Sequence, residues 1–225
     1  VFKVFGESEM KKNVLLYSHE LKTGGAPAVL CEMGKILKKK YNVVVLSPSD
    51  GMMRQQFEQD GMEVLISGEI TDELRDVIAQ EFDFIVANTT LALPIVIKLA
   101  GKIPVYWWIH ENTPAYEGRC GMIEYYQFAA KYAKIFSAGH VAADNFYHFY
   151  KIETEILEFG LADNYLAERD VQRHEYINVI CPSTVCELKG QDILVHAIQK
   201  MDAGLRNKCR FIFLGDLRND NINEY

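Results

Sequence analysis

A pair of glycines stands where the first predicted helix begins. Gly24 and Gly25 lie in the loop His19–Ala26 (HELKTGGA), between an apolar, β-branched run and an amphipathic segment. The unpaired N–H groups and the positive dipole end of a helix favour an anion there. Glycines also suit a tight strand-to-helix turn, so phosphate binding and a purely structural turn both stay open. The spacing is neither GxGxxG nor GxxxxGK[ST], which gives a dinucleotide dehydrogenase or a P-loop NTPase little support.

A titratable pair follows a second apolar run. His110 and Glu111 come directly after VYWWI, and Asn88 ends the run FDFIVAN. Ligands of open α/β sheets bind beyond the carboxyl ends of strands, which is where these side chains are expected. A capping role for each stays open beside a functional one.

A third candidate is a lysine placed against electrostatic preference. Lys189 and Gly190 stand in STVCELKGQD (Ser183–Asp192), immediately before an amphipathic helix. A cation beside a helix N-terminus is unfavourable unless an anion lies between them. A solvated surface lysine is the alternative.

The elements that must position these residues alternate almost throughout. Apolar runs separated by segments of 3.6-residue period predict right-handed βαβ units, and therefore a Rossmann-like doubly wound parallel sheet. Strands are expected at 13–18, 43–47, 62–66, 84–88, 105–110, 135–138 and 155–157, and helices at 26–40, 52–60, 71–80, 90–100, 122–134 and 140–150. The run Val105–His110 is apolar on both faces, as in a buried central strand, which favours Trp107 and Trp108 as core residues.

The periodicity stops near residue 161. We expect a Rossmann-like domain over 1–160, an interdomain linker over 161–175, and the truncated start of a second domain over 176–225. In that last part, strands at 176–182 and 210–215 flank a helix at 191–201. One βαβ unit is too little to bury a core alone.

Composition narrows the function classes. The 225 residues include 24 Lys and Arg against 31 Asp and Glu, and this net charge of −7 argues against nucleic acid as the main partner. There is no 18-residue apolar run and no signal-peptide pattern after Val1. Five cysteines without a CxxC pair indicate reduced thiols in a cytoplasmic protein, with Cys181 and Cys186 expected to be buried. Lys38–Lys40 could touch acidic lipids, although three cations also suit a helix C-terminus.

Taken in order, the motifs resemble a known family. NVLLYSHELKTGGAPAVLCEMGKIL, YWWIHE, IFSAGHVAADNF, ILEFGLAD and ICPSTVCELKGQDILVHAI match, over about residues 13–216, the retaining nucleotide-sugar glycosyltransferases of family 4 (group 1) with the GT-B fold. The resemblance implies an acceptor-side N-terminal domain and a donor-binding C-terminal domain. It identifies the chain as an N-terminal fragment that would be inactive alone, because the family's paired glutamates would lie beyond Tyr225.

The resemblance also implies roles for residues. Gly24 and Gly25 would approach the donor phosphate, Lys189 would bind the diphosphate, and His110 would face the transferred sugar. Thr184 stands where many members carry arginine, and a hydroxyl there could still donate a hydrogen bond to phosphate. Three further residues are candidate contacts to the acceptor or the sugar: Glu111, Asn88 and Glu20.

The reaction so implied needs no metal and no cofactor. A nucleoside diphosphate sugar would donate a hexosyl group to a glycan or lipid-linked acceptor, in polysaccharide or cell-envelope glycan synthesis. The protein would be cytoplasmic, with at most peripheral membrane contact at the cytoplasmic face. Two alternatives stay open: a non-catalytic transferase-like interaction module of a larger protein, and a GT-B epimerase acting on a sugar nucleotide.

Overall fold

The computed structural model describes residues 11–111, 120–160, 175–186 and 189–215. The chain forms two compact units, Val1–Asp163 and Asn164–Tyr225. The predicted linker 161–175 lies, apart from Glu175, outside the described residues.

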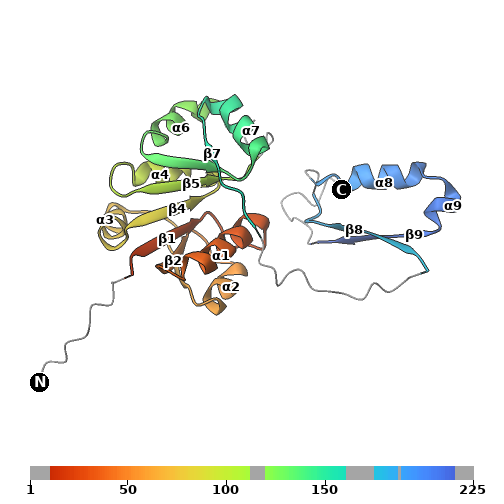
Figure 1. Ribbon diagram of the computed structural model, residues 1–225, viewed down its shortest axis with the longest axis horizontal. Helices are drawn as coiled ribbons and strands as arrows, with labels where there is room; N and C mark the ends of the chain where they lie inside the picture. The colour runs from red at the N-terminus through yellow and green to blue at the C-terminus, as the bar shows by residue number, and fades with distance from the viewer. Residues whose placement is uncertain (1–10, 112–119, 161–174, 187–188, 216–225) are drawn as a thin grey trace, which may run out of the picture. The chain divides into compact units, whose positions relative to one another are not determined.

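Unit 1 contains a parallel sheet of seven strands in the order β3-β2-β1-β4-β5-β6-β7 (Figure 1). The strands are β1 (Asn13–Ser18), β2 (Asn42–Ser47), β3 (Glu63–Ile66), β4 (Phe84–Asn88), β5 (Val105–Ile109), β6 (Ala133–Ser137) and β7 (Glu155–Ile156). Every paired neighbour is parallel. The doubly wound α/β architecture is confirmed.

The helices follow the strands in alternation. They are α1 (Gly25–Leu37), α2 (Met53–Gln59), α3 (Asp72–Glu81), α4 (Leu93–Lys98), α6 (Ile123–Ala129) and α7 (His140–Tyr150), with short 3₁₀ turns η1 (Thr90–Ala92) and η2 (Cys120–Met122).

Three predicted helix boundaries are wrong by three residues or more. The helix expected over 26–40 ends at Leu37. The helix expected over 90–100 starts with η1, because the Glu111 carboxylate accepts hydrogen bonds from both the backbone N–H and the hydroxyl of Thr90. The helix expected over 122–134 ends at Ala129, because Ala133 already pairs with Val105 in the sheet. Sheet pairing overrides the helix propensity of alanine and lysine here.

Both faces of the sheet carry apolar side chains. One core lies between the strands and α3, α4, α6 and α7, and includes Leu15, Ile85, Trp107, Ile135, Leu93, Tyr126, Phe146 and Tyr150. The other lies under α1 and α2, and includes Val14, Leu16, Val45, Val64, Leu30, Phe57 and Met62. Trp107 and Trp108 are buried, as expected.

The register brings the carboxyl ends of four strands level with one another. Ser18 of β1 lies opposite Asn88 of β4, and Asn88 lies opposite Trp108 of β5. Ile109 then lies opposite Ser137 of β6. The strand order reverses between β1 and β4, which is where open α/β sheets bind ligands.

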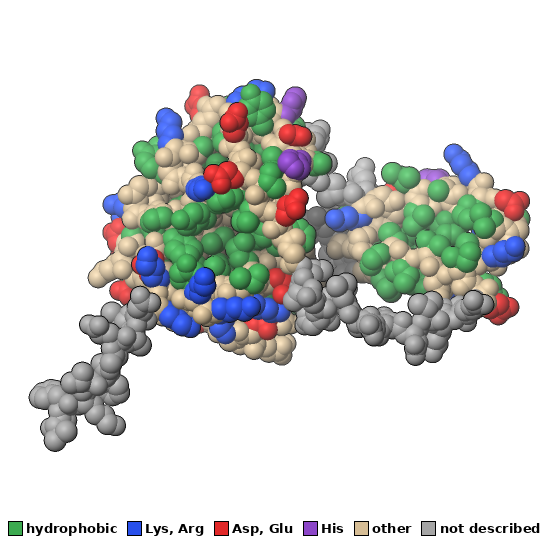
Figure 2. Space-filling model, viewed as in Figure 1, with side chains coloured by type: hydrophobic (Ala, Val, Ile, Leu, Met, Phe, Trp, Pro, Cys, Tyr) green, Lys and Arg blue, Asp and Glu red, His purple; other side chains and the backbone are tan. Residues whose placement is uncertain are grey.

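One part of the sheet departs from the prediction. Tyr106 of β5 is 37% exposed, so the strand expected to be buried on both faces is open on one. An apolar groove of about 480 Å³ runs here between α1 and strands β4 to β6. Figure 2 shows hydrophobic side chains gathered on this face, with Lys or Arg side chains along its edge. The apolar cluster under α1 and α2 includes Val86 of β4 but no residue of β5 or β6.

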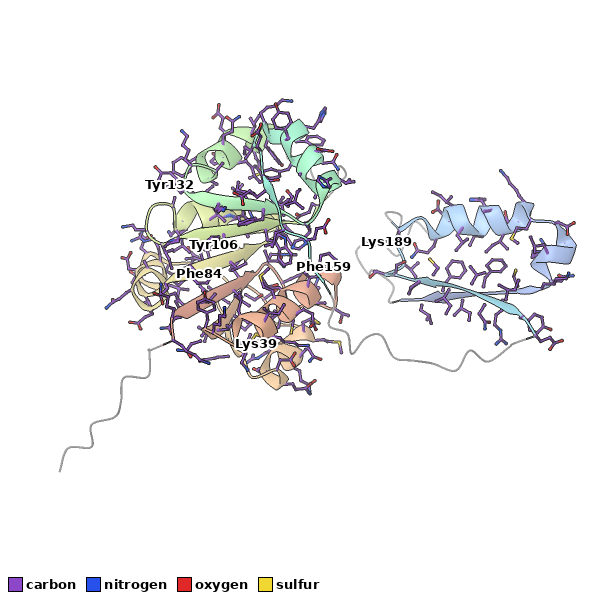
Figure 3. The ribbon with its side chains drawn as sticks, viewed as in Figure 1. Lys39, Phe84, Tyr106, Tyr132, Phe159 and Lys189 are labelled. Carbon is purple, nitrogen blue, oxygen red and sulfur yellow. The ribbon has the colours of Figure 1, made fainter. Side chains whose placement is uncertain are left out.

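The groove holds a row of aromatic rings. Tyr41 meets Phe84 edge-on at 5.4 Å between ring centroids, and Phe84 meets Tyr106 in the same way at 5.4 Å. Tyr106 then stacks on Phe136 at 6.3 Å. Phe84, Tyr106 and Phe159, which also lines the groove, are labelled in Figure 3.

Unit 2 contains β8 (Ile177–Pro182), α8 (Gln191–Lys200), α9 (Ala203–Arg206) and β9 (Cys209–Leu214). The two strands pair in parallel, as the predicted βαβ unit requires. Helix α9 was not expected from the sequence. Among the described residues of the whole chain, no helix is long and apolar enough to cross a membrane.

Candidate functional site

His110 and Asn88 meet at the carboxyl edge of the sheet. The Nε2 atom of His110 lies 2.8 Å from Oδ1 of Asn88. The two side chains meet because β4 and β5 are neighbouring strands, with Asn88 at the end of β4 and His110 just after β5. The imidazole packs against Trp108, with ring centroids 4.4 Å apart. Burial lowers the pKa of His110 below its ordinary value of 6.5, while the negative charge of Glu111 acts in the opposite direction. His110 is therefore neutral at pH 7.

A second histidine stands at the same edge and was not predicted. His19, directly after β1, has Nδ1 3.0 Å from the Thr89 hydroxyl and Nε2 3.6 Å from the Glu20 carboxylate. Glu20, a predicted sugar or acceptor contact, thus faces His19. The signal in the sequence was present, because His19 follows β1 just as His110 follows β5.

Thr89 links these groups through an unusual backbone. Its φ of 72° and ψ of 166° fall in a region that is essentially restricted to glycine. Its N–H donates to the Trp108 carbonyl at 2.8 Å, and its own carbonyl accepts from the indole of Trp107 at 2.7 Å. These bonds hold Thr89 in a conformation that it would not adopt alone.

Glu111 anchors the loops. Its Oε1 accepts from the N–H and hydroxyl of Thr90 at 2.7 and 2.8 Å, and its Oε2 accepts from the N–H of His110 at 3.0 Å. A carboxylate with three donors orders the ends of β4 and β5. Its predicted contact with an acceptor or sugar stays a prediction.

Helix α1 begins beside this cluster with the glycine pair. Gly24 is the N-cap residue in an extended conformation, with no side-chain cap and no acidic residue in the first turn. A Cβ atom built on Gly25 would meet nothing within 4 Å, and one on Gly24 would meet only Cδ of Pro27 at 3.8 Å. Among the described residues, neither the packing nor the backbone conformation at these two positions requires glycine.

Unit 2 presents the other predicted residues. Lys189 is exposed just before α8 (Figure 3), whose N-cap Gly190 has a φ of 67°. The side-chain amide of Gln191 donates to the Ser183 hydroxyl at 2.8 Å and to the Thr184 carbonyl at 2.9 Å, which orders this loop. Cys186 lines a neighbouring pocket and Cys181 is also half-buried, so the expectation that both are buried was wrong, since the strand pair leaves them at a partly open surface.

Within the described residues, no three His, Cys, Asp or Glu side chains gather in a way that could hold a metal ion. The edge of unit 1 instead offers an uncapped helix end, a neutral histidine and hydroxyl groups. Such groups can bind an anion and hydrogen-bond to a polyhydroxylated ligand.

The family model for glycosyl-transferase family 4 matches residues 10–152. The chain belongs to this family. The matched range holds the whole edge cluster, from His19 to Glu111. No curated protein sequence matches the chain.

Several solved structures share the fold of this family 4 chain. Anabaena HepE in complex with UDP and glucose has a TM-score of 0.77 at 18% identity, over 93% of this chain and 62% of that one. A glycosyltransferase from Rickettsia africae has a TM-score of 0.64 at 15% identity, over 95% and 70%. An alpha-glucosyltransferase in complex with UDP and a DNA 13-mer has a TM-score of 0.60 at 14% identity, over 90% and 56%.

These structural similarities establish the GT-B-like fold of the chain. The chain spans 62% of the length of the HepE structure that it matches. UDP, glucose and DNA are named here as ligands of those proteins.

Proposed function

We propose that the protein is a nucleotide-sugar glycosyltransferase that moves a hexosyl group from a nucleoside diphosphate sugar to an acceptor hydroxyl, with retention of anomeric configuration. The observation that carries the proposal is the uncapped start of α1, with two glycines that the fold does not require, beside the half-buried His110. Membership of family 4 and the UDP complexes of fold relatives support the same reading.

The glycine pair supplies the phosphate site in this proposal. Without side chains at Gly24 and Gly25, a diphosphate oxygen can approach the backbone N–H groups of the first turn. The helix dipole adds a favourable interaction with the negative charge that builds up as the sugar–phosphate bond breaks. Lys189, in unit 2, is proposed to bind diphosphate through its full positive charge.

The reaction balances without a further reagent. The acceptor oxygen forms a bond to the anomeric carbon, the bond from that carbon to the diphosphate breaks, and the acceptor proton passes to a diphosphate oxygen. Attack from the departing face accounts for retention. The proposal includes independence from metal ions, since helix N–H groups and Lys189 would stabilise the leaving group.

The acceptor is proposed to be a glycan or a lipid-linked saccharide, in polysaccharide or cell-envelope glycan synthesis at the cytoplasmic face of a membrane. The net charge of −7 does not favour nucleic acid. One fold relative was solved in complex with DNA, so an oligonucleotide should be tested as a comparison acceptor.

Binding of UDP and UDP-glucose, measured by calorimetry, tests the donor site. We expect Gly25→Ala to weaken binding about tenfold or more while leaving thermal stability unchanged or slightly raised, because alanine fits the fold and stiffens the unfolded chain. Gly68→Ala is the matched control, since its Cβ would also fit, 3.8 Å from the Pro48 carbonyl oxygen.

Lys189→Ala is paired with Lys39→Ala, an exposed lysine just after α1 (Figure 3). Only the first change is expected to weaken binding of UDP, by about 10- to 100-fold, with chelator present or absent. Equal effects of the two lysine changes, or no binding of any nucleoside diphosphate by the wild-type protein, would refute the proposal.

A further inference from the structure

Asn88 makes two hydrogen bonds that join separate parts of the candidate site. Its Nδ2 lies 3.0 Å from the carbonyl oxygen of Ala26, in the first turn of α1, and its Oδ1 lies 2.8 Å from Nε2 of His110. The side chain is fully buried, so water does not compete for either bond. Sixty-two positions separate Asn88 from Ala26 along the chain.

The Ala26 contact decides how the Asn88 amide is oriented. A carbonyl oxygen only accepts hydrogen bonds, so the atom facing it must be the NH₂ group. The reversed amide would place two acceptor oxygens 3.0 Å apart with no proton between them. Oδ1 therefore faces His110, and because Oδ1 also only accepts, Nε2 of the imidazole must carry the proton.

We propose that Asn88 is a positioning residue that holds neutral His110 in the Nε2–H tautomer and ties the imidazole to the first turn of α1. Asn88 is thereby a support for the histidine. The direct sugar or acceptor contact expected of it from the sequence is replaced by this role.

The tautomer determines what His110 can offer a ligand. With Nε2–H donating to Asn88, the ring nitrogen left for a ligand is Nδ1, which accepts a hydrogen bond in the neutral imidazole. Burial keeps the imidazole neutral at pH 7. If the proposed function holds, Nδ1 accepts a hydrogen bond from a hydroxyl of the sugar, and His110 does not act as a cation beside the diphosphate.

The state of the free imidazole can be measured without any ligand, so this test is separate from the donor-binding test above. Long-range ¹H–¹⁵N spectra of the 225-residue chain with ¹⁵N-labelled histidine report which ring nitrogen carries the proton. His110→Gln assigns the signals, and His19 provides a second edge histidine for comparison. A bare Nδ1 and a protonated Nε2 at pH 7.5 are expected; a protonated Nδ1, or averaging between the tautomers, would overturn the proposal.

Asn88→Asp is the variant that tests the tie. Aspartate keeps an acceptor for Nε2–H but loses the donor to Ala26 and adds a negative charge beside that of Glu111, which is the charged neighbour acting on His110 in the described residues. We expect the NMR-titrated pKa of His110 to rise by about one unit or more, with Nε2–H retained in the neutral form. An unchanged pKa in a folded variant, checked by its amide spectrum, would show that residue 88 does not contact the imidazole.

Discussion

At the scale of single residues, the strained backbone of Thr89 is the least expected feature. Its φ of 72° would suit glycine, yet the side chain is β-branched. Such conformations cost about 1–3 kcal/mol and persist where the surroundings over-determine them. Here the hydroxyl bonded to His19 and the backbone bonds to Trp107 and Trp108 do so. This conformation places the Thr89 hydroxyl 3.0 Å from Nδ1 of His19.

The backbone strain predicts that glycine is more stable than alanine at position 89, which is the reverse of the usual order. Thr89→Gly and Thr89→Ala both remove the hydroxyl, but only alanine keeps a Cβ in the unfavourable conformation. We expect the glycine variant to be more stable than the alanine variant by about 1 kcal/mol, measured as the free energy of unfolding in urea.

Position 87 supplies the comparison for this pair. Ala87 lies in the regular strand β4, where glycine normally costs about 0.5–1 kcal/mol relative to alanine. Ala87→Gly should therefore lower stability. If alanine were also the more stable residue at position 89, Thr89 would not be strained.

At the scale of elements, the helices of unit 1 differ in how their N-termini are satisfied. Helix α3 follows the edge strand β3 and is capped by the Thr71 side chain, which accepts a hydrogen bond from the N–H of Leu74 at 3.2 Å. It also carries Asp72 and Glu73 in its first turn. Helix α1, beside the point where the strand order reverses, starts at glycine with neither feature. Helices α2, α4 and α7 also lack both features, so the place of α1 at the strand-order reversal, and not the missing cap alone, marks it as a candidate anion site.

The Thr71 cap makes a direct prediction. Thr71→Ala should lower the free energy of unfolding by about 1 kcal/mol, because a helix N–H loses its acceptor. Thr71→Ser keeps the oxygen and should restore most of that loss. A urea titration of both variants measures the difference; if serine were no better than alanine, the side-chain cap would contribute nothing.

At the scale of the whole molecule, unit 1 carries an open apolar groove on one face of its sheet. A parallel sheet is normally covered on both faces, yet the row Tyr41, Phe84, Tyr106 and Phe136 lies along an apolar groove. Contiguous exposed apolar surface promotes association and binds hydrophobic dyes.

A matched pair of tyrosines tests this surface. Tyr106 and Tyr132 are 37% and 45% exposed, but only Tyr106 lines the groove (Figure 3). Tyr106→Thr should reduce both fluorescence of a bound hydrophobic dye and concentration-dependent self-association of the chain, whereas Tyr132→Thr should change neither. Equal responses would mean that the groove is not the surface responsible.

Much of the architecture follows from local pattern. Alternation of apolar runs with amphipathic segments predicts the strands and helices of unit 1, because period and β-branched content act over a few residues. The ranges of β1, β4 and α7 match the structure at both ends. Two of the errors, at η1 and at the end of α6, occur where a distant carboxylate or a neighbouring strand competes with local propensity.

The sequence by itself determined which residues lie at or just after strand ends, namely Asn88, His110 and Glu111, and that the glycine pair lies at the start of the first helix. Only the tertiary structure decided what they contact: Asn88 with Ala26 and His110, His19 with Thr89, and Glu111 with Thr90. Parallel pairing brings together segments separated by long crossovers, so these contacts depend on strand order and register. The same holds for the open face at Tyr106, because an apolar residue in a strand is buried only if a helix covers that part of the sheet.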